Sequence, residues 1–295
     1  MKHTAILIIA LFLAMQNNCN AQNKPVKKEV DKSKTTEVKK DQKVNKETNL
    51  KILASGSYSG VEEPFIFVVR DKQALEKLSD LPLNKIEFKE DVDFEKNIVV
   101  AAFAGEFRTG GYSVEINETD GKVFVNLNSP PKDGMVTQAL TQPFSVVLVP
   151  IKEGESLNLE VSDYWKDKSQ NYSVKSGSVE YSGGIAGIHK QYETDGKIQV
   201  YKLGNFLTLI LDIKGKDKES NRKLSAIITG ELKDNSLVVE NINGGNLIGI
   251  PHPSMKFEAK FSDDKISINL IAEDENSPVR DGFSGRGNFE AVKVN

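Results

Sequence analysis

Residues 97–116 read N-I-V-V-A-A-F-A-G-E-F-R-T-G-G-Y-S-V-E-I, and this stretch decides the fold. Its apolar run, 98–104, predicts a buried strand that ends at Gly105. A short loop, 106–111, follows, and its adjacent glycines permit positive φ angles and hence a tight turn. From Tyr112, apolar residues recur at every second position, which is typical of a strand with one buried face. The stretch therefore predicts antiparallel β structure with a tight loop.

The charge and the cysteine and histidine counts exclude several classes of protein. The chain has 39 Lys+Arg and 42 Asp+Glu residues and a net charge of -3, which argues against a nucleic-acid partner. Its only cysteine, Cys19, precedes the folded part, which therefore has no disulfide, thiol nucleophile or thiolate metal site. His189 and His252 are too few for a multi-histidine metal centre. The motifs of hydrolases, metalloproteases and phosphate-binding loops are absent, so the sequence predicts no enzyme, no metal and no cofactor.

The N-terminus predicts export. Residues 1–21 have a short positive start and an apolar run, 5–15, that is too short to span a membrane and suits a signal peptide. Two alternatives remain for its removal. Ordinary cleavage would leave Gln22 first, whereas lipidation would make Cys19 the mature N-terminus and the only membrane attachment. Both place the protein outside the cytoplasm, in the periplasm, at the outer membrane or secreted.

A tether is predicted over residues 22–49. It is rich in Lys and Glu, has no aromatic residue and cannot bury enough apolar surface to offset its chain entropy. We therefore expect residues 22–49 to be disordered.

A first folded domain is expected over residues 50–164, as an antiparallel sandwich or barrel with one short helix. Asp71 is the expected N-cap of a helix at 72–78. Asp120-Gly121 predicts a hairpin between two alternating segments. The expected strands are 51–57, 65–70, 98–104, 112–117, 122–128 and 144–149. A polar linker, 165–175, is expected to follow.

A second folded domain is expected over residues 176–295, where eight to nine short strands predict an up-and-down barrel or a sandwich. Asp195-Gly196 predicts another hairpin. Leucines and isoleucines alternate from Leu207 to Ile213, with Ile210 as an exception on the polar face. A barrel of this strand count fits an interior cavity for a lipid or small ligand, by analogy of shape alone. His252, Arg280 and Arg286 are interpreted as loop residues, and no family is identified for this domain.

The first domain resembles the PrcB C-terminal domain family over about residues 65–161. The resemblance rests on an apolar strand before Thr109-Gly110-Gly111-Tyr112, a Pro-Pro-x-x-Gly loop, Gln142-Pro143-Phe144 and a V-x-x-V-P ending at Pro150. The family takes its name from a lipoprotein subunit of a surface protease complex. The resemblance implies an exported, non-catalytic accessory role with a protein partner in the cell envelope, for which a protease is the first candidate.

The loop predicts a partner-binding site at Arg108, Thr109, Gly110, Gly111 and Tyr112. Arg108 is expected to be exposed and to make the contact. The alternative is structural: the glycines serve a tight turn, and Tyr112 packs at the core or its rim. The loop is also similar to the T-T-G-Y/F loop of chagasin-type protease inhibitors, which makes inhibition a second hypothesis. The chain lacks that family's other binding motifs, an Asn-Pro before this loop and an R-P-x-W loop.

Overall fold

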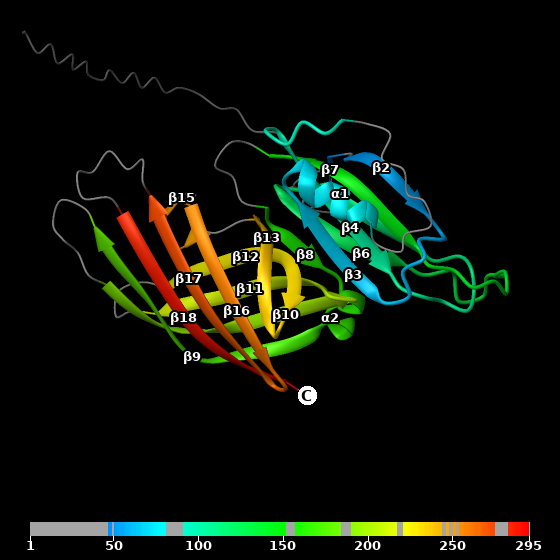
Figure 1. Ribbon diagram of the computed structural model, residues 1–295. Helices are drawn as coiled ribbons and strands as arrows, with labels where there is room; N and C mark the ends of the chain where they lie inside the picture. Colours follow the sequence, from blue (N-terminus) through cyan, green and yellow to red (C-terminus); the bar gives the residue numbers. More distant parts are fainter. Residues whose placement is uncertain are drawn as a thin grey trace, which may run out of the picture. The chain divides into compact units, whose positions relative to one another are not determined.

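The computed structural model describes residues 47–48, 50–80, 91–151, 157–183, 190–216, 221–243, 246–247, 250–251, 254–274 and 283–294. The predicted signal peptide and nearly all of the tether lie outside these residues. Val44–Asn295 forms one compact unit. Strands dominate this unit (Figure 1), so the expected mainly β fold class is confirmed.

The first part of the unit contains two four-stranded sheets. One has the order β2-β7-β4-β3, with β2 at Lys51–Gly56, β7 at Phe144–Pro150, β4 at Asn97–Ala104 and β3 at Pro64–Val69. The other has the order β1-β5-β6-β8, with β1 at Glu47–Thr48, β5 at Ser113–Thr119, β6 at Lys122–Asn128 and β8 at Leu159–Val161. Strand β1 takes up the end of the segment predicted as a tether. Only the β6–β8 pair is parallel among the described pairs.

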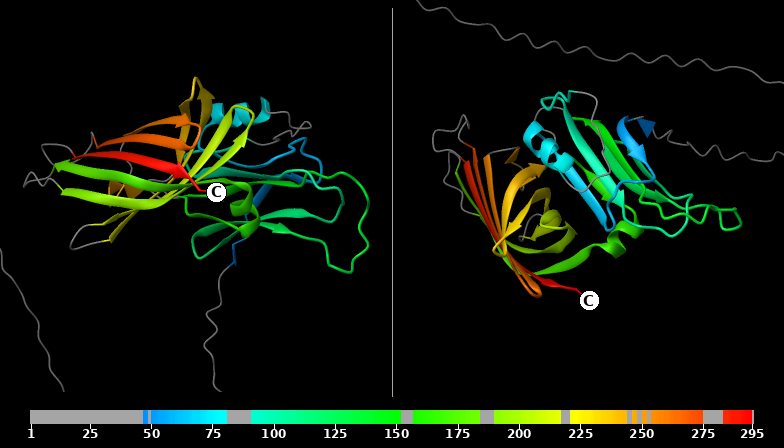
Figure 2. Two further views of the ribbon diagram at one scale, coloured as in Figure 1. Left: turned by 90° about the horizontal axis from the view of Figure 1, so that it is seen from below. Right: turned by 45° about the vertical axis from the view of Figure 1, so that its right-hand side comes forward.

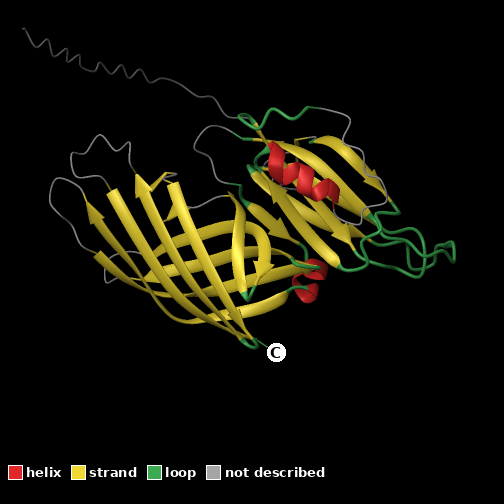
Figure 3. Cartoon of the chain, viewed as in Figure 1, coloured by secondary structure: helices red, strands yellow, loops and turns green. Residues whose placement is uncertain are grey.

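The hairpin and the helix N-cap that the sequence predicts in this part are confirmed. Asp120 and Gly121 have φ angles of 53° and 75°, as the hairpin turn between β5 and β6 requires. The helix α1, Lys72–Asp80, begins after Asp71, whose Oδ1 accepts a hydrogen bond from the Ala74 amide at 2.8 Å. Figure 3 shows α1 across one face of the β2-β7-β4-β3 sheet.

The second part is a closed barrel of eight antiparallel strands in the order β10-β11-β12-β13-β16-β17-β18-β9. Its inward side chains form one apolar cluster. Seven of the eight contacts between neighbouring strands are long ladders, whereas the described residues of β13 and β16 share one pair, Ser236 with Lys260. The strand bounds are Gln170–Gly183 (β9), Lys190–Leu203 (β10), Phe206–Lys216 (β11), Asn221–Lys233 (β12), Ser236–Asn243 (β13), Ser254–Ser262 (β16), Lys265–Asp274 (β17) and Phe283–Lys293 (β18). A small hairpin, β14 (Asn246–Leu247) with β15 (Ile250–Pro251), follows β13.

The segment expected to be a linker, 165–175, contains regular structure. The helix α2 spans Asp163–Lys168, and β9 begins at Gln170. Trp165 of α2 is completely buried, and its carbonyl accepts a hydrogen bond from the Tyr201 hydroxyl at 3.2 Å. The polar residues of this segment lie on the exposed side of a short helix that packs through its one tryptophan.

The hairpin predicted at Asp195-Gly196 is wrong. Both residues lie inside β10, where the pairing with β9 shifts between Glu193 and Gly196 as a β-bulge. A Cβ at Gly196 would lie 2.4 Å from the Asp212 carbonyl oxygen of β11. Glycine is present here because two backbones approach closely, and not because the chain reverses.

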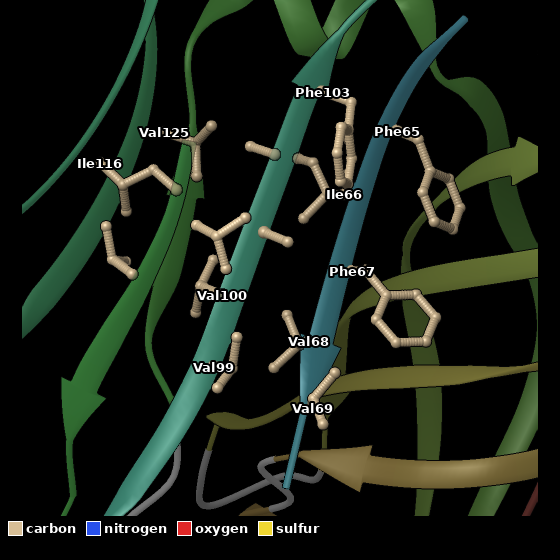
Figure 4. Packing of buried hydrophobic residues seen from close by; sticks show 14 of the residues in the cluster. Phe65, Ile66, Phe67, Val68, Val69, Val99, Val100, Phe103, Ile116 and Val125 are labelled. Carbon is tan, nitrogen blue, oxygen red and sulfur yellow. The ribbon is translucent and has the colours of Figure 1, made fainter. Parts of the chain in front are cut away.

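Strand β3 joins the two parts. Its sequence, P-F-I-F-V-V, is apolar throughout, and every residue from Phe65 to Val69 is buried. Figure 4 shows Phe65 and Phe67 pointing away from Ile66 and Val68, toward the strands of the barrel. Phe67 makes an edge-on contact with Phe206, at 6.4 Å between ring centroids. A strand buried on both faces is apolar at consecutive positions, which explains the missing alternation.

Apolar side chains on the outside of the barrel complete this joint. Tyr201 and Ile227 are buried in the same cluster as β3, and Ile210 packs against that cluster. The Thr229 hydroxyl donates a long hydrogen bond, 3.4 Å, to the Val68 carbonyl of β3. The barrel therefore covers the edge strand β3, which would otherwise expose apolar side chains and main-chain groups.

Candidate partner-binding site

The predicted site begins where β4 ends. Gly105 has a φ angle of 75°, and a Cβ there would lie 2.8 Å from the Glu62 carbonyl oxygen. The next amide, of Glu106, donates to that same oxygen at 3.0 Å. Only glycine fits this corner, which directs residues 106–112 out of the sheet.

A second loop, 129–142, holds the first in place, and we call 105–112 and 129–142 together the loop pair. Phe107 and Thr141 exchange two main-chain hydrogen bonds of 2.8 Å each. The Gly110 amide donates to the Thr137 carbonyl at 2.8 Å, and the Thr141 hydroxyl donates to the Thr109 carbonyl at 3.0 Å. Figure 2 (left) shows these loops extending beyond the ends of the strands. The loop pair is thus a hydrogen-bonded projection with a defined conformation.

The two glycines of the predicted site serve this packing. A Cβ at Gly110 would lie 2.4 Å from the Thr137 hydroxyl oxygen, and one at Gly111 would lie 2.9 Å from Pro130. Gly111 also has a φ angle of 91°. Both glycines therefore allow the loops to approach each other, which accounts for them without a ligand.

Tyr112 belongs to a row of aromatic rings at the base of the loop pair. It is half-buried and stacks on Phe107, at 4.1 Å between centroids. Phe107 contacts Tyr164 at 6.0 Å, and Tyr164 contacts Trp165 at 5.4 Å. The Tyr164 hydroxyl donates to the carbonyl of Ala104, the last residue of β4. Tyr112 therefore supports the base of the loop pair.

The exposed side chains of the loop pair are mainly ones that sequence reasoning missed. Arg108 is exposed, as expected. Met135 is fully exposed, and Leu140 is 51% exposed. Tyr58, outside the loop pair, is 59% exposed, and its backbone pairs with Gln142 at the end of the second loop. We call Arg108, Met135 and Leu140 the tip of the loop pair.

The pKa of Tyr164 predicts how the base of the loop pair responds to alkali. Burial, with nearby Tyr112, raises the pKa of Tyr164 to about 12, above the usual value of about 10 for an exposed tyrosine. The resulting stabilisation is complete below pH 10 and is lost as the pH rises toward 12, because the unfolded chain loses this proton first. Tyr164→Phe cannot ionise, so its unfolding free energy should fall less steeply above pH 10.

Urea unfolding of wild type and Tyr164→Phe at pH 8, 10 and 11 checks this. The variant should be about 1 kcal/mol less stable at pH 8, because it lacks the hydrogen bond to Ala104. The gap should narrow at pH 11. Tyr201, whose pKa is also raised by burial, is present in both proteins and serves as the internal reference. A constant gap would contradict the prediction.

The other residues singled out in the sequence are not gathered at this site. The interpretation of Arg286 as a loop residue is wrong, because it lies on β18, paired with Ile271 of β17, and is exposed. His189, His252 and Arg280 lie outside the described residues. Among the residues that the structure describes, no three Asp, Glu, His or Cys side chains are placed to hold a metal ion. None of the described helices is long and apolar enough to cross a membrane.

The strand-loop-strand geometry around the loop pair can be compared with known families. Residues 98–150 match the family model described as PrcB C-terminal. The match runs from the second residue of β4 to the end of β7 and includes both loops. It confirms the resemblance to the PrcB C-terminal family, over a shorter segment than the expected 65–161. Searches of curated proteins and of solved structures found no match.

Proposed function

We propose that this chain is an exported, non-catalytic envelope protein that binds another protein through the tip of its loop pair. The observation that carries the proposal is the exposure of Met135 and Leu140 on a projection whose backbone is fixed by hydrogen bonds. Exposed apolar side chains are a feature of protein-binding surfaces, and Met135 and Leu140 are carried by the same loop. A fixed backbone lowers the entropy lost on binding.

The match to the PrcB C-terminal family supports a protein of a protease complex as the partner. It covers the loop pair completely, so the segment that this chain shares with the family includes the proposed contact surface. We infer that the partner is a protein of the cell envelope and that the chain acts as an accessory subunit of a protease complex. The leader supports export, and the mass of the mature N-terminus distinguishes a lipidated Cys19 from a free Gln22.

The inhibitor hypothesis receives less support from the geometry. In an inhibitor of that type, the loop aromatic would have to reach the protease. Here Tyr112 is stacked on Phe107 at the base of the loop pair. Interior ligand binding is also less supported, because the inward side chains of the barrel pack as one apolar cluster.

Site-specific photocrosslinking tests the proposed function. A photoreactive amino acid at position 135 or 108 should crosslink, in intact cells, to the same protein. The same group at position 238 is the matched control, because Val238 is 46% exposed but lies on β13 of the barrel. Met135→Asp, which places a charge where an apolar contact is proposed, should reduce crosslinking from position 108 at least tenfold. Equal crosslinking from positions 135 and 238, or none from 135 and 108, would contradict the proposal.

A further inference from the structure

The outer wall of the barrel carries a groove of about 620 Å³ that is separate from the loop pair. Four neighbouring strands, β16, β17, β18 and β9, form it, and Figure 1 shows them side by side. Side chains alternate between the two faces of each strand. The inward ones, such as Ile268 and Phe289, are buried in the barrel cluster, so the groove belongs to the outer face.

The strand register defines one side of the groove. Asn269 of β17 lies directly opposite Asn288 of β18. The row continues to Glu258 of β16 at one end and to Ser178 of β9 at the other. All four residues line the groove, so this side presents one carboxylate, two amides and one hydroxyl in a row across the strands.

A second row forms the other side, two residues farther along each strand. Ser267 of β17 lies opposite Glu290 of β18, and the row ends at Lys260 of β16 and Ser176 of β9. These residues also line the groove. With strands about 4.8 Å apart, each row extends for about 14 Å across the wall. The floor between the rows is the backbone around Ile268, Phe289 and Gly177.

The chemistry of these two rows selects among ligand classes. The floor backbone is paired within the sheet, so an extended peptide cannot add to it as a strand. The rows contain no apolar side chain, which disfavours a lipid or an apolar peptide. Their two carboxylates outnumber their one ammonium group, which disfavours a polyanion. Hydroxyls and carboxylates on both sides, with two amides on one side, suit a ligand that donates and accepts hydrogen bonds along its length.

We propose that this groove binds a neutral, hydroxyl-rich chain of the oligosaccharide class, which lies across β16, β17, β18 and β9 between the two rows. Asn269 and Asn288 stand at the centre of one row, where each amide can donate to one hydroxyl and accept from another. This site is independent of the loop pair, so the barrel would attach to a glycan while the tip binds protein.

Calorimetric titration with neutral hexasaccharides of glucose, mannose and N-acetylglucosamine tests the proposal on the full mature chain. At least one should bind, and Asn269→Ala/Asn288→Ala should weaken its binding about tenfold or more. Lys197→Ala/Lys202→Ala is the control, because both lysines are exposed on β10 outside the groove, and it should bind as wild type does. Asn269, Asn288 and Lys197 lie on the outer face and Lys202 is exposed at the end of β10, so thermal unfolding should be unchanged in both variants.

Three results would overturn the proposal. The first is that no hexasaccharide binds at about 10 mM, a concentration at which a ligand with a dissociation constant of about 1 mM nearly saturates its site. The second is that the Asn269→Ala/Asn288→Ala variant binds as tightly as wild type. The third is that dextran sulfate binds more tightly than neutral dextran. Photocrosslinking from Met135 should not change in the groove variant, so the two proposals can fail separately.

Discussion

Phe67→Ala is expected to lower the free energy of unfolding by about 3–5 kcal/mol and to split unfolding into two transitions. The ring of Phe67 is 1% exposed and contacts Phe206 of the barrel. Its removal leaves a cavity between β3 and the barrel, where the two parts stabilise each other. Without that coupling, the sheets of the first part and the barrel should unfold at different denaturant concentrations. Tryptophan fluorescence and circular dichroism, followed together in urea, check this.

Phe103→Ala is the matched control. Phe103 is equally buried, but it stacks on Phe144 within the first part, at 6.0 Å between centroids. Its loss should cost a similar free energy, about 3–5 kcal/mol, through the first part alone. A single transition in Phe67→Ala, shifted as far as in Phe103→Ala, would show that Phe67 contributes only to local packing.

Gly196→Ala is expected to destabilise the barrel by about 2–4 kcal/mol. The added Cβ would lie 2.4 Å from the Asp212 carbonyl oxygen and 2.6 Å from the Ile213 Cα, both backbone atoms of β11. Because neither atom can rotate away, β10 and β11 must separate at the bulge. Thermal unfolding followed by far-UV circular dichroism measures the loss.

Gly204→Ala separates this steric effect from the general cost of replacing glycine. Gly204 has a φ angle of 59°, but no atom lies within 4 Å of its added Cβ. The cost there should be about 1 kcal/mol, from backbone strain alone. The prediction for Gly196 is wrong if the two variants are equally stable.

The two Asp-Gly pairs show what local sequence can and cannot predict. Asp120-Gly121 forms the expected turn, because two short alternating strands flank it and both residues adopt positive φ angles. Asp195-Gly196 has the same dipeptide but lies within a fourteen-residue strand. Glycine is required at position 196 because the backbone of β11 lies too close for a Cβ, and β11 is adjacent only after the barrel has formed. Nothing in the dipeptide itself carries that information.

Ile210 was visible in the sequence as an exception to alternation, and the structure gives its cause. It lies on the outside of the barrel, where the cluster around β3 covers it. The unbroken apolar run of β3 has the same origin. Each pattern indicates a second buried face, but neither names the element that covers it, because that element is remote in the chain.

The loop of the candidate site was predictable, whereas its partner loop and its tip were not. Thr109-Gly110-Gly111-Tyr112 identified a tight turn at the end of a buried strand. The hydrogen bonds from Gly110 to Thr137 and from Phe107 to Thr141 depend on how β4 and β7 place two distant loops. Met135 and Leu140 are apolar, and composition alone assigns such residues to a core.

The position of β3 in the chain has a consequence for biosynthesis. Strand β3 ends at Val69, and β10, the first barrel strand that packs against β3, begins at Lys190. Over a hundred residues must therefore be synthesised after β3 before the barrel can cover it. At 5–20 residues per second, this interval is on the order of ten seconds. Throughout it, Phe65 and Phe67 have no barrel to pack against, and exposed apolar edge strands are the segments through which nascent chains aggregate. A chain of this design therefore carries an aggregation-prone edge until the barrel is made, and a fragment that stops before the barrel keeps that edge exposed permanently.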